Sequence, residues 1–369
     1  MQVVYHSFEG RFSDSPRAIY AALRARSASA EHVWLTREDH QDAFPGDVAL
    51  LEYGSPACIA ALESCDVLVA NTHTDFEWSK RPETTYLQTW HGTPLKRIHW
   101  DVLWAPEGRL ARLQRDVDRW DVLLSPNRVS TPLFRRAFGY DREVLESGYP
   151  RNDVLSAPDR DRVRARVREE LGIADGQTAV LYTPTWRDDM VFAEGGKAFA
   201  LGLDIARLAE RLGDGHVLLL RLHRMLAAQA AAAAGPSVLD VSARPEVSEL
   251  YLAADVMITD YSSTMFDFAV TGKPMLFYTH DLDDFRDRLR GFYFDLEAEA
   301  PGPLLRSGDA LVDALGDLPA VTAAHARRYA RFRARFCHNE DGRATDRVVA
   351  RVLGSAEPPS GAVRGALTG

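Results

Sequence analysis

Short apolar runs recur along the chain, and each run ends in small polar residues before a helical pattern begins. Three of these runs open with the same Asp-Val pair: 66–73 (DVLVANTH), 121–128 (DVLLSPNR) and 255–263 (DVMITDYSS). Runs that are apolar at every position indicate strands buried on both faces, which is typical of parallel sheets covered by helices. Their alternation with helical periodicity predicts an α/β protein.

The alternation is interrupted once, near the middle of the chain. Residues 147–161 (SGYPRNDVLSAPDRD) contain a glycine and two prolines, and a second α/β series begins at 178–189 (TAVLYTPTWRDD). Since 369 residues exceed one ordinary core, we expect two doubly wound, Rossmann-like domains facing each other across a cleft. Their predicted limits are 1–152 and 153–335. The last residues, 354–369, are rich in Pro, Gly, Ser and Ala and predict a disordered tail.

Composition and charge narrow the classes of function. A net charge of -9 argues against a nucleic-acid binder, which needs a basic surface. The three cysteines have no metal-ligand spacing and are typical of free thiols in a reducing compartment. We expect no cleaved leader, because the N-terminus has no basic region followed by an apolar one. We expect no spanning helix, because no apolar stretch reaches about 18 residues. The predicted location is therefore the cytoplasm or the surface of a membrane.

The first candidate site is 86–98 (YLQTWHGTPLKRI), where a strand runs into His91, a glycine and Lys96. Gly92 permits close approach of another backbone. A histidine beside phosphate-binding groups can act as a general base. A histidine that only supports the local structure is the alternative, and this stretch alone leaves the choice open.

Two further runs end in comparable residues. In 181–189 (LYTPTWRDD) a strand leads to Thr185 and Arg187, which is either a turn with a packing tryptophan or a nucleotide contact. In 217–225 (VLLLRLHRM) a strand delivers His223 at its carboxyl end. Because ligands of such sheets lie outside the carboxyl ends of the strands, His91 and His223 are expected to face each other across the cleft.

The most informative stretch is 255–278, where a strand ends at Asp260 and Ser262 and Ser263 open a helix. Serines at a helix start satisfy its unpaired amides, and those amides also attract anions. An ordinary capped helix is the alternative. The chain has no Walker loop, no calcium loop, no closely spaced metal-ligand motif and no nucleophile elbow, so we expect no resident metal and no cofactor.

Together these motifs resemble the CDP-glycerol glycerophosphotransferase family, the teichoic acid primases and polymerases. The resemblance runs through nearly the whole chain, in the family's order: 6–23 (HSFEGRFSDSPRAIYAAL), QTWHGTPLKR, SGYPRND, LYTPTWRD, LRLH, LYLAADVMITDYSSTMFDFA, KPMLFY, 290–295 (RGFYFD) and 341–348 (DGRATDRV). It implies the GT-B fold, with a C-terminal helix, predicted over 336–353, crossing back to the first domain.

The resemblance also implies the reaction: transfer of a polyol phosphate, such as glycerol phosphate, from a CDP-activated donor such as CDP-glycerol to a hydroxyl of a lipid-linked acceptor, with release of CMP. This is the chemistry of teichoic-acid-like wall or capsule polymers. His91 would then be the base and His223 would stabilise the donor pyrophosphate. The remaining residues would bind the donor: Arg187, Ser262 and Ser263 the phosphates, Thr185, Asp260 and Asp267 the nucleotide, and Lys96 would add charge beside His91.

Two rival functions remain open from the sequence. A GT-B glycosyltransferase that uses a nucleotide sugar would release a nucleoside diphosphate instead of CMP. A non-catalytic binding subunit would have broken motifs, whereas His91, His223 and the 260–263 run are intact.

A lipid-linked acceptor also implies contact with the membrane surface. The candidate segment is 98–120, which has tryptophans and arginines along an amphipathic pattern. A half-buried structural helix is the alternative.

Overall fold

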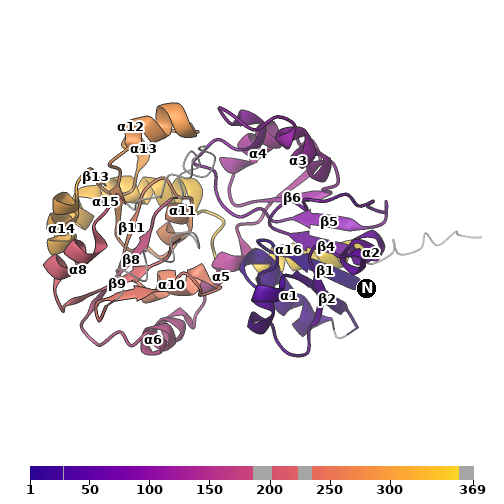
Figure 1. The fold of residues 1–369 in the computed structure, drawn as a ribbon, viewed down its shortest axis with the longest axis horizontal. Coiled ribbons are helices and arrows are strands. Elements are labelled where there is room, and N and C mark those ends of the chain that lie inside the picture. The colour runs from indigo at the N-terminus through magenta and orange to yellow at the C-terminus, as the bar shows by residue number, and fades with distance from the viewer. Residues whose placement is uncertain (28, 186–201, 223–234, 357–369) are drawn as a thin grey trace, which may run out of the picture.

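The computed structural model describes residues 1–27, 29–185, 202–222 and 235–356. Two lobes lie side by side, each built around one parallel sheet (Figure 1). In the described chain the first sheet has the strand order β3-β2-β1-β4-β5-β6-β7, and the second has the order β10-β9-β8-β11-β12-β13. The predicted architecture of two Rossmann-like domains is confirmed.

The strands coincide with the apolar runs of the sequence. The first sheet consists of β1 (Gln2–His6), β2 (Glu31–Thr36), β3 (Ala49–Glu52), β4 (Val67–Ala70), β5 (Thr85–Gln88), β6 (Val122–Ser125) and β7 (Glu143–Glu146). The second consists of β8 (Thr178–Thr183), β9 (His216–Leu220), β10 (Val238–Asp240), β11 (Val256–Thr259), β12 (Met275–Tyr278) and β13 (Leu304–Leu305). The three runs that open with Asp-Val supply β4, β6 and β11.

Helices cover both faces of each sheet. The first lobe carries α1 (Asp14–Arg26), α2 (Pro56–Ser64), α3 (Arg109–Val117), α4 (Ser130–Phe138) and the short 3-10 helices η1 (Glu38–Ala43) and η2 (His99–Asp101). In the sequence between β7 and β8 lie η3 (Pro150–Asn152), α5 (Asp153–Ser156) and α6 (Arg160–Glu170). The second lobe carries α8 (Ile205–Leu212), α10 (Val247–Ala253), α11 (Thr264–Ala269), α12 (Leu282–Asp284), the π-helical turn η5 (Phe285–Leu289), α13 (Leu296–Glu299), α14 (Gly308–Gly316) and α15 (Leu318–Phe336).

Alternate residues of each strand enter different cores, which explains the continuous apolar runs. On β1, Val3 and Tyr5 pack into one core of the first lobe, whereas Val4 packs into the core on the opposite face. On β8, Leu181 and Val180 divide in the same way between the two cores of the second lobe.

The C-terminal helix α16 (Ala344–Ala356) returns to the first lobe (Figure 1). Its Val348 and Val349 are fully buried in the core that contains Val3 and Ile19. The predicted crossing is thus confirmed, but the helix begins at Ala344, because residues 337–343 form the turn between α15 and α16. The Asp153 carboxylate caps α16 by accepting hydrogen bonds from the amides of Ala344 at 2.9 Å and Thr345 at 2.8 Å.

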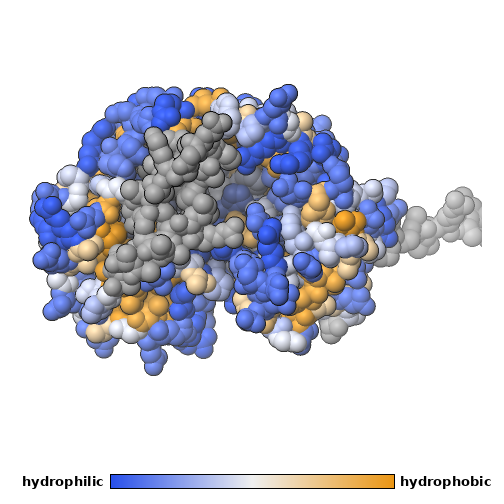
Figure 2. All heavy atoms as spheres, viewed as in Figure 1, coloured by the Kyte–Doolittle hydropathy of each residue, from blue (hydrophilic) through white to orange (hydrophobic). Residues whose placement is uncertain are grey.

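The division of the chain into domains at residue 152 stays a prediction. Residues 354–356, which the sequence assigns to the tail, belong to α16, and 357–369 lie outside the described residues. The face in Figure 2 is mainly hydrophilic, with apolar groups scattered over both lobes. No helix within the described ranges has both the length and the apolar character needed to cross a membrane.

Candidate active site

Polar side chains gather where the central strands of the first sheet end. The sheet places β1 beside β4, and β4 beside β5, so the residues that follow these strands share one edge. Thr72 Oγ1, after β4, lies 3.2 Å from Nε2 of His6, the last residue of β1. The side chain of Gln88, at the end of β5, donates a hydrogen bond to the carbonyl of Thr72 at 3.1 Å. This edge lies at the point where the strand order reverses, the usual ligand site of such sheets.

His91 lies three residues beyond β5, on a constrained backbone. Trp90 has a φ of +52°, an uncommon value for a residue with a side chain. The Trp90 ring stacks on the His91 imidazole with centroids 4.3 Å apart. The ring of Phe8 also contacts this imidazole, with 5.7 Å between the two ring centroids. Burial lowers the pKa of His91 to about 4, against the opposing effect of the Asp14 carboxylate. The imidazole is therefore neutral near pH 7 and able to accept a proton.

Gly92 brings this loop into contact with the second lobe. A Cβ placed on Gly92 would lie 2.7 Å from Oγ and 3.0 Å from Cβ of Ser263. Only glycine leaves room for Ser263 at this approach. The residue next to His91 thus touches the loop between β11 and α11.

The chain beyond Gly92 pairs with another segment of the second lobe. The amide of Arg97 donates to the Gly291 carbonyl at 3.1 Å, and the amide of Tyr293 donates to the Leu95 carbonyl at 2.8 Å. Lys96 and Phe292 form an antiparallel bridge between them. The motifs QTWHGTPLKR and RGFYFD therefore bind one another through their backbones, and this pairing fixes the backbone of Lys96.

Asp260 joins two loops at the carboxyl edge of the second sheet. Its Oδ1 accepts hydrogen bonds from the amides of Thr185, at 2.9 Å, and Tyr261, at 2.6 Å. These loops follow β8 and β11, which are neighbours at the strand-order reversal of this sheet. Below them, Thr259 Oγ1 donates to the Thr183 carbonyl at 2.9 Å. Asp260 thus fixes the relative positions of the two loops that form the predicted nucleotide site.

The two serines differ from the prediction that both would cap a helix. Ser262 accepts a 3.3 Å hydrogen bond from the amide of Thr264, the first residue of α11. Ser263 occupies the N-cap position, yet its side chain makes no capping hydrogen bond and lies against Gly92 instead. The reason is the close approach of the two lobes, which the local sequence pattern does not contain.

Asp267 faces the segment between the domains. Its Oδ2 accepts a hydrogen bond from Arg151 Nη2 at 2.8 Å, and its Oδ1 accepts one from Asn152 Nδ2 at 2.9 Å. Arg151 Nη1 also donates to Oδ2 of Asp14, at 2.8 Å. Both oxygens of Asp267 are therefore engaged by protein groups, and its predicted contact with the nucleotide stays a prediction.

The sequence did not single out Asp14 or Arg151, although the motifs that contain them were noted. The chain carries 44 basic residues, and nothing in the local pattern distinguishes the buried Arg151 from the many exposed arginines. The predicted Arg187 and His223 lie outside the described residues. Among the residues that the structure does describe, no three His, Cys, Asp or Glu side chains are grouped as metal ligands.

Comparison with known proteins identifies the family of the chain. The family model of CDP-Glycerol:Poly(glycerophosphate) glycerophosphotransferase matches residues 1–354. The chain is 37% identical over 356 residues to a teichoic acid glycerol-phosphate transferase of Staphylococcus aureus, with 94% of this chain and 91% of that relative covered. It is 36% identical over 362 residues to a teichoic acid poly(glycerol phosphate) polymerase of Bacillus subtilis, where 95% of this chain spans only 48% of the relative.

Comparison with solved structures identifies the same family and the same fold. The wall teichoic acid polymerase TagF superposes with a TM-score of 0.86 at 34% identity, over 96% of this chain and 88% of that one. The UDP-GlcNAc 2-epimerase of Neisseria meningitidis, with a TM-score of 0.58 and 13% identity over 96% of this chain and all of that one, shares the fold alone. The chain belongs to the CDP-glycerol:poly(glycerophosphate) glycerophosphotransferase family.

Proposed function

We propose that the protein transfers glycerol phosphate from CDP-glycerol to a hydroxyl group of a lipid-linked acceptor and releases CMP, as a step in the synthesis of a teichoic-acid-like polymer. The observation that carries this proposal is the contact between Gly92 and Ser263. This contact holds the loop that carries the neutral His91 imidazole against the loop after β11, where the strand order of the second sheet reverses. Family membership points to CDP-glycerol as the donor, and a histidine variant of TagF has been solved after a soak with CDPG.

In the proposed reaction His91 takes the proton of the attacking hydroxyl. The acceptor oxygen forms a bond to the phosphorus of glycerol phosphate, and the bond from that phosphorus to the bridging oxygen of CMP breaks. CMP leaves with the electron pair of that bond. The negative pyrophosphate, once bound, would favour the protonated form of His91, so the base becomes stronger when the donor is present.

The donor would lie over the loops that Asp260 joins, beyond β8 and β11. Thr185 and Asp260 would shape the nucleotide pocket, while Ser262 and Ser263 would contact the phosphates. Lys96, Arg187 and His223 would neutralise charge on the phosphates, which is the main requirement of phosphoryl transfer. These assignments follow the family resemblance and, for Thr185, Asp260, Ser262 and Ser263, their positions directly after β8 and β11.

CMP release by the purified protein tests the proposal, with CDP-glycerol and CDP-ribitol as donors and a lipid-linked or soluble glycerol-phosphate acceptor. We expect CMP only when an acceptor is present, and a loss of at least about 10²-fold in His91→Gln. His32→Gln is the matched control, because His32 is half-buried at the start of β2, next to Glu31, and also has a lowered pKa. Release of a nucleoside diphosphate from a nucleotide sugar would instead support the glycosyltransferase function.

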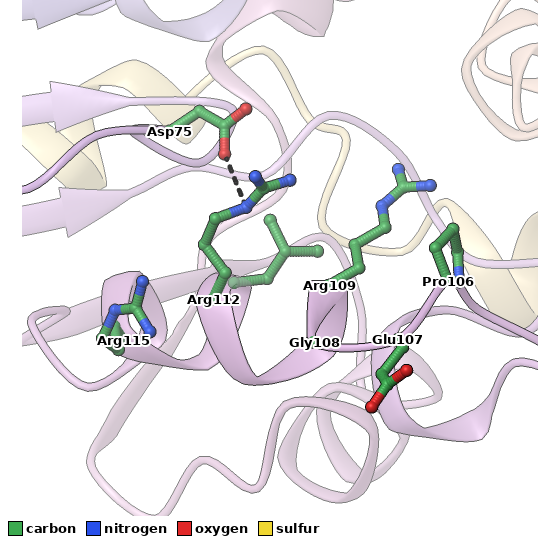
Figure 3. Close-up of a pocket in the computed structure, with 8 residues that line it drawn as sticks. Asp75, Pro106, Glu107, Gly108, Arg109, Arg112 and Arg115 are labelled. Carbon is green, nitrogen blue, oxygen red and sulfur yellow. Dashed lines mark ion pairs between the residues drawn. The ribbon is translucent and has the colours of Figure 1, made fainter.

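We also propose that the protein rests on the membrane through the segment before α3. Among the described residues, the exposed large apolar side chains are Trp100, Leu103 and Trp104, with 49%, 45% and 67% of their surfaces accessible. They precede α3, whose arginines border a cavity of about 700 Å³. Figure 3 shows Arg109 and Arg112 extending from α3 to the same side, with Arg112 paired to Asp75.

Exposed tryptophans next to arginines suit the interface of an anionic bilayer. Sedimentation with vesicles tests this placement. The protein is expected to bind vesicles that contain phosphatidylglycerol and to lose that binding when Trp100 and Trp104 are both replaced by serine. CMP release with a soluble acceptor is expected to be unchanged in this double variant. Equal sedimentation of the variant and the original protein would contradict the proposed membrane contact.

A further inference from the structure

Trp90 and His91 are neighbours in the chain, and yet their rings stack. The ring centroids lie 4.3 Å apart, with an angle of 26° between the ring planes. Neighbouring side chains of an extended strand point to opposite faces of the sheet, so two such rings stack only where the backbone turns. The φ of +52° at Trp90 supplies that turn.

The turn is held by polar groups of the same loop. A positive φ costs energy for a bulky residue. The Trp90 amide donates a hydrogen bond to Gln88 Oε1 at 2.9 Å, and the Trp90 carbonyl accepts one from Thr89 Oγ1 at 3.0 Å. Both hydrogen bonds are buried. The loop thus maintains an unfavourable backbone angle whose result is the stacked pair, and strain kept in this way points to a functional role.

The indole ring is fixed by the core of the first lobe. Trp90 is 8% exposed. The rings of Phe138, at the end of α4, and of His73 lie nearly perpendicular to it, with centroids 4.8 Å and 5.8 Å away. His91 is less buried than Trp90. The indole is therefore the rigid partner of the pair, and the imidazole is the accessible one.

An aromatic face acts differently on the two forms of a histidine. The electron-rich face attracts a cation, most strongly when the ring is tryptophan and water is excluded, whereas a neutral imidazole gains mainly packing. The attraction of Trp90 for His91 therefore grows as the imidazole takes up a proton. An interaction that is stronger in the transition state than in the ground state accelerates a reaction.

The charged groups around His91 leave a need for such support. Burial is the largest effect on the His91 pKa, and it disfavours the imidazolium. Among the charged groups, Asp14 favours the imidazolium, whereas Arg151 and His73 oppose it. Trp90 is in direct ring contact with the imidazole and can favour its protonated form without a charge of its own.

We propose that Trp90 is a positioning residue of the transfer reaction, whose indole face orients the His91 imidazole and stabilises the imidazolium that forms when His91 takes the acceptor proton. In this step the O–H bond of the acceptor breaks and an N–H bond forms on the imidazole. This inference rests on the proposed function of His91.

Two variants of Trp90 separate this role from simple filling of the core. Trp90→Phe keeps an aromatic face, whereas Trp90→Leu keeps only apolar volume. We expect kcat for CMP release to be at least about fivefold lower in Trp90→Leu than in Trp90→Phe, which corresponds to the lower range of a desolvated cation–π contact, with equal KM for CDP-glycerol. Equal kcat values in the two variants would overturn the proposal.

Trp78 provides the matched control for packing. It is buried in the same core, where its ring packs on Tyr86 and Arg119. Trp78→Phe and Trp78→Leu therefore make the same two changes of volume away from the imidazole, and we expect them to have equal kcat. A leucine variant that loses as much kcat at Trp78 as at Trp90 would show that Trp90 serves only the core.

A second measurement needs no substrate, so it decides the inference even if the proposed reaction is wrong. The ¹³C resonance of labelled His91, assigned by its absence in His91→Gln, is followed from about pH 7 to about pH 4.5. We expect the ratio of protonated to neutral His91 at the lower pH to be about 5- to 30-fold smaller in Trp90→Leu than in Trp90→Phe. An equal or larger ratio in Trp90→Leu would refute the stabilisation.

A third measurement leaves Trp90 in place, so it does not depend on the folding of the Trp90 variants. An imidazolium quenches the fluorescence of an indole on which it stacks. Between about pH 7 and about pH 4.5, emission is expected to fall further in the original protein than in His91→Gln. The difference isolates His91 from the other histidines near tryptophans, such as His73 beside Trp120. The same pH dependence in both proteins would show that the imidazolium does not face the indole.

Discussion

Replacement of Gly92 by alanine tests whether contact between the lobes sets the position of His91. The added Cβ would lie 2.7 Å from Ser263 Oγ, about 0.7 Å short of the 3.4 Å at which ordinary contact begins. Either Ser263 moves or the loop that carries His91 withdraws by several tenths of an ångström. Gly92 has no left-handed backbone conformation, so the effect arises from this contact and not from strain at the substituted residue.

The expected loss of activity is larger than the expected loss of stability. Misplacement by about 1 Å can lower a rate by about 10²-fold, so a displacement of this size predicts a loss of roughly 10- to 100-fold in kcat. Overpacking costs about 1–3 kcal/mol, and the reduced freedom of the unfolded chain offsets about 0.4–1 kcal/mol of it. The variant should therefore stay folded while it loses activity.

A double-mutant cycle gives the decisive measurement. Ser263→Gly removes both atoms that the new Cβ meets, so the double variant should be no less active than Ser263→Gly alone in CMP release. Gly46→Ala is the control, because a Cβ on Gly46 meets no atom within 4 Å. If the losses from the two single changes simply add as free energies in the double variant, the contact does not position His91.

Three further substitutions have outcomes that the structure specifies. Arg151→Met leaves two buried carboxylates without their cation and should lower the free energy of unfolding by about 3–5 kcal/mol, measured by urea denaturation. Asp153→Ala removes the cap from the amides of Ala344 and Thr345 and should cost about 0.5–2 kcal/mol in the same assay. His99 is buried, and burial lowers its pKa to about 4. Between pH 4 and its ordinary pKa near 6.5 it therefore binds a proton only in the unfolded protein, so the free energy of unfolding rises with pH across this window. His99→Gln should reduce the slope of the unfolding free energy against pH by about 1.4 kcal/mol per pH unit.

Much of the fold was predictable because burial on both faces of a parallel sheet requires apolar residues at every strand position. The runs that became β4, β6 and β11 are evident for this reason. The end of each run was informative as well, since polar residues that follow a buried strand lie at the ligand edge. His91, Thr185 and Asp260 were singled out in this way, and the structure places them just beyond β5, β8 and β11.

Contacts between distant parts of the chain were not predictable from local patterns. Ser262 and Ser263 have the composition of a helix cap, but only the three-dimensional arrangement shows that Ser263 packs on Gly92. Residues 98–120 have one amphipathic pattern, whereas the helix α3 covers only Arg109–Val117 because Gly108, at a φ of +71°, precedes it. In each case a tertiary contact or a single backbone angle overrides the pattern.

The short helix α11 shows why the two halves of the site depend on each other. It spans only Thr264–Ala269, and a helix this short depends on tertiary contacts for its stability. Its ends are held instead by the first lobe and the linker, through Gly92 at the start and Arg151 one turn later. A change in docking between the lobes would therefore move the proposed donor loop and the proposed base, His91, together. Such coupling suits a reaction whose nucleophile and activated phosphate are bound by different domains, because the reactive geometry exists only when the domains are docked.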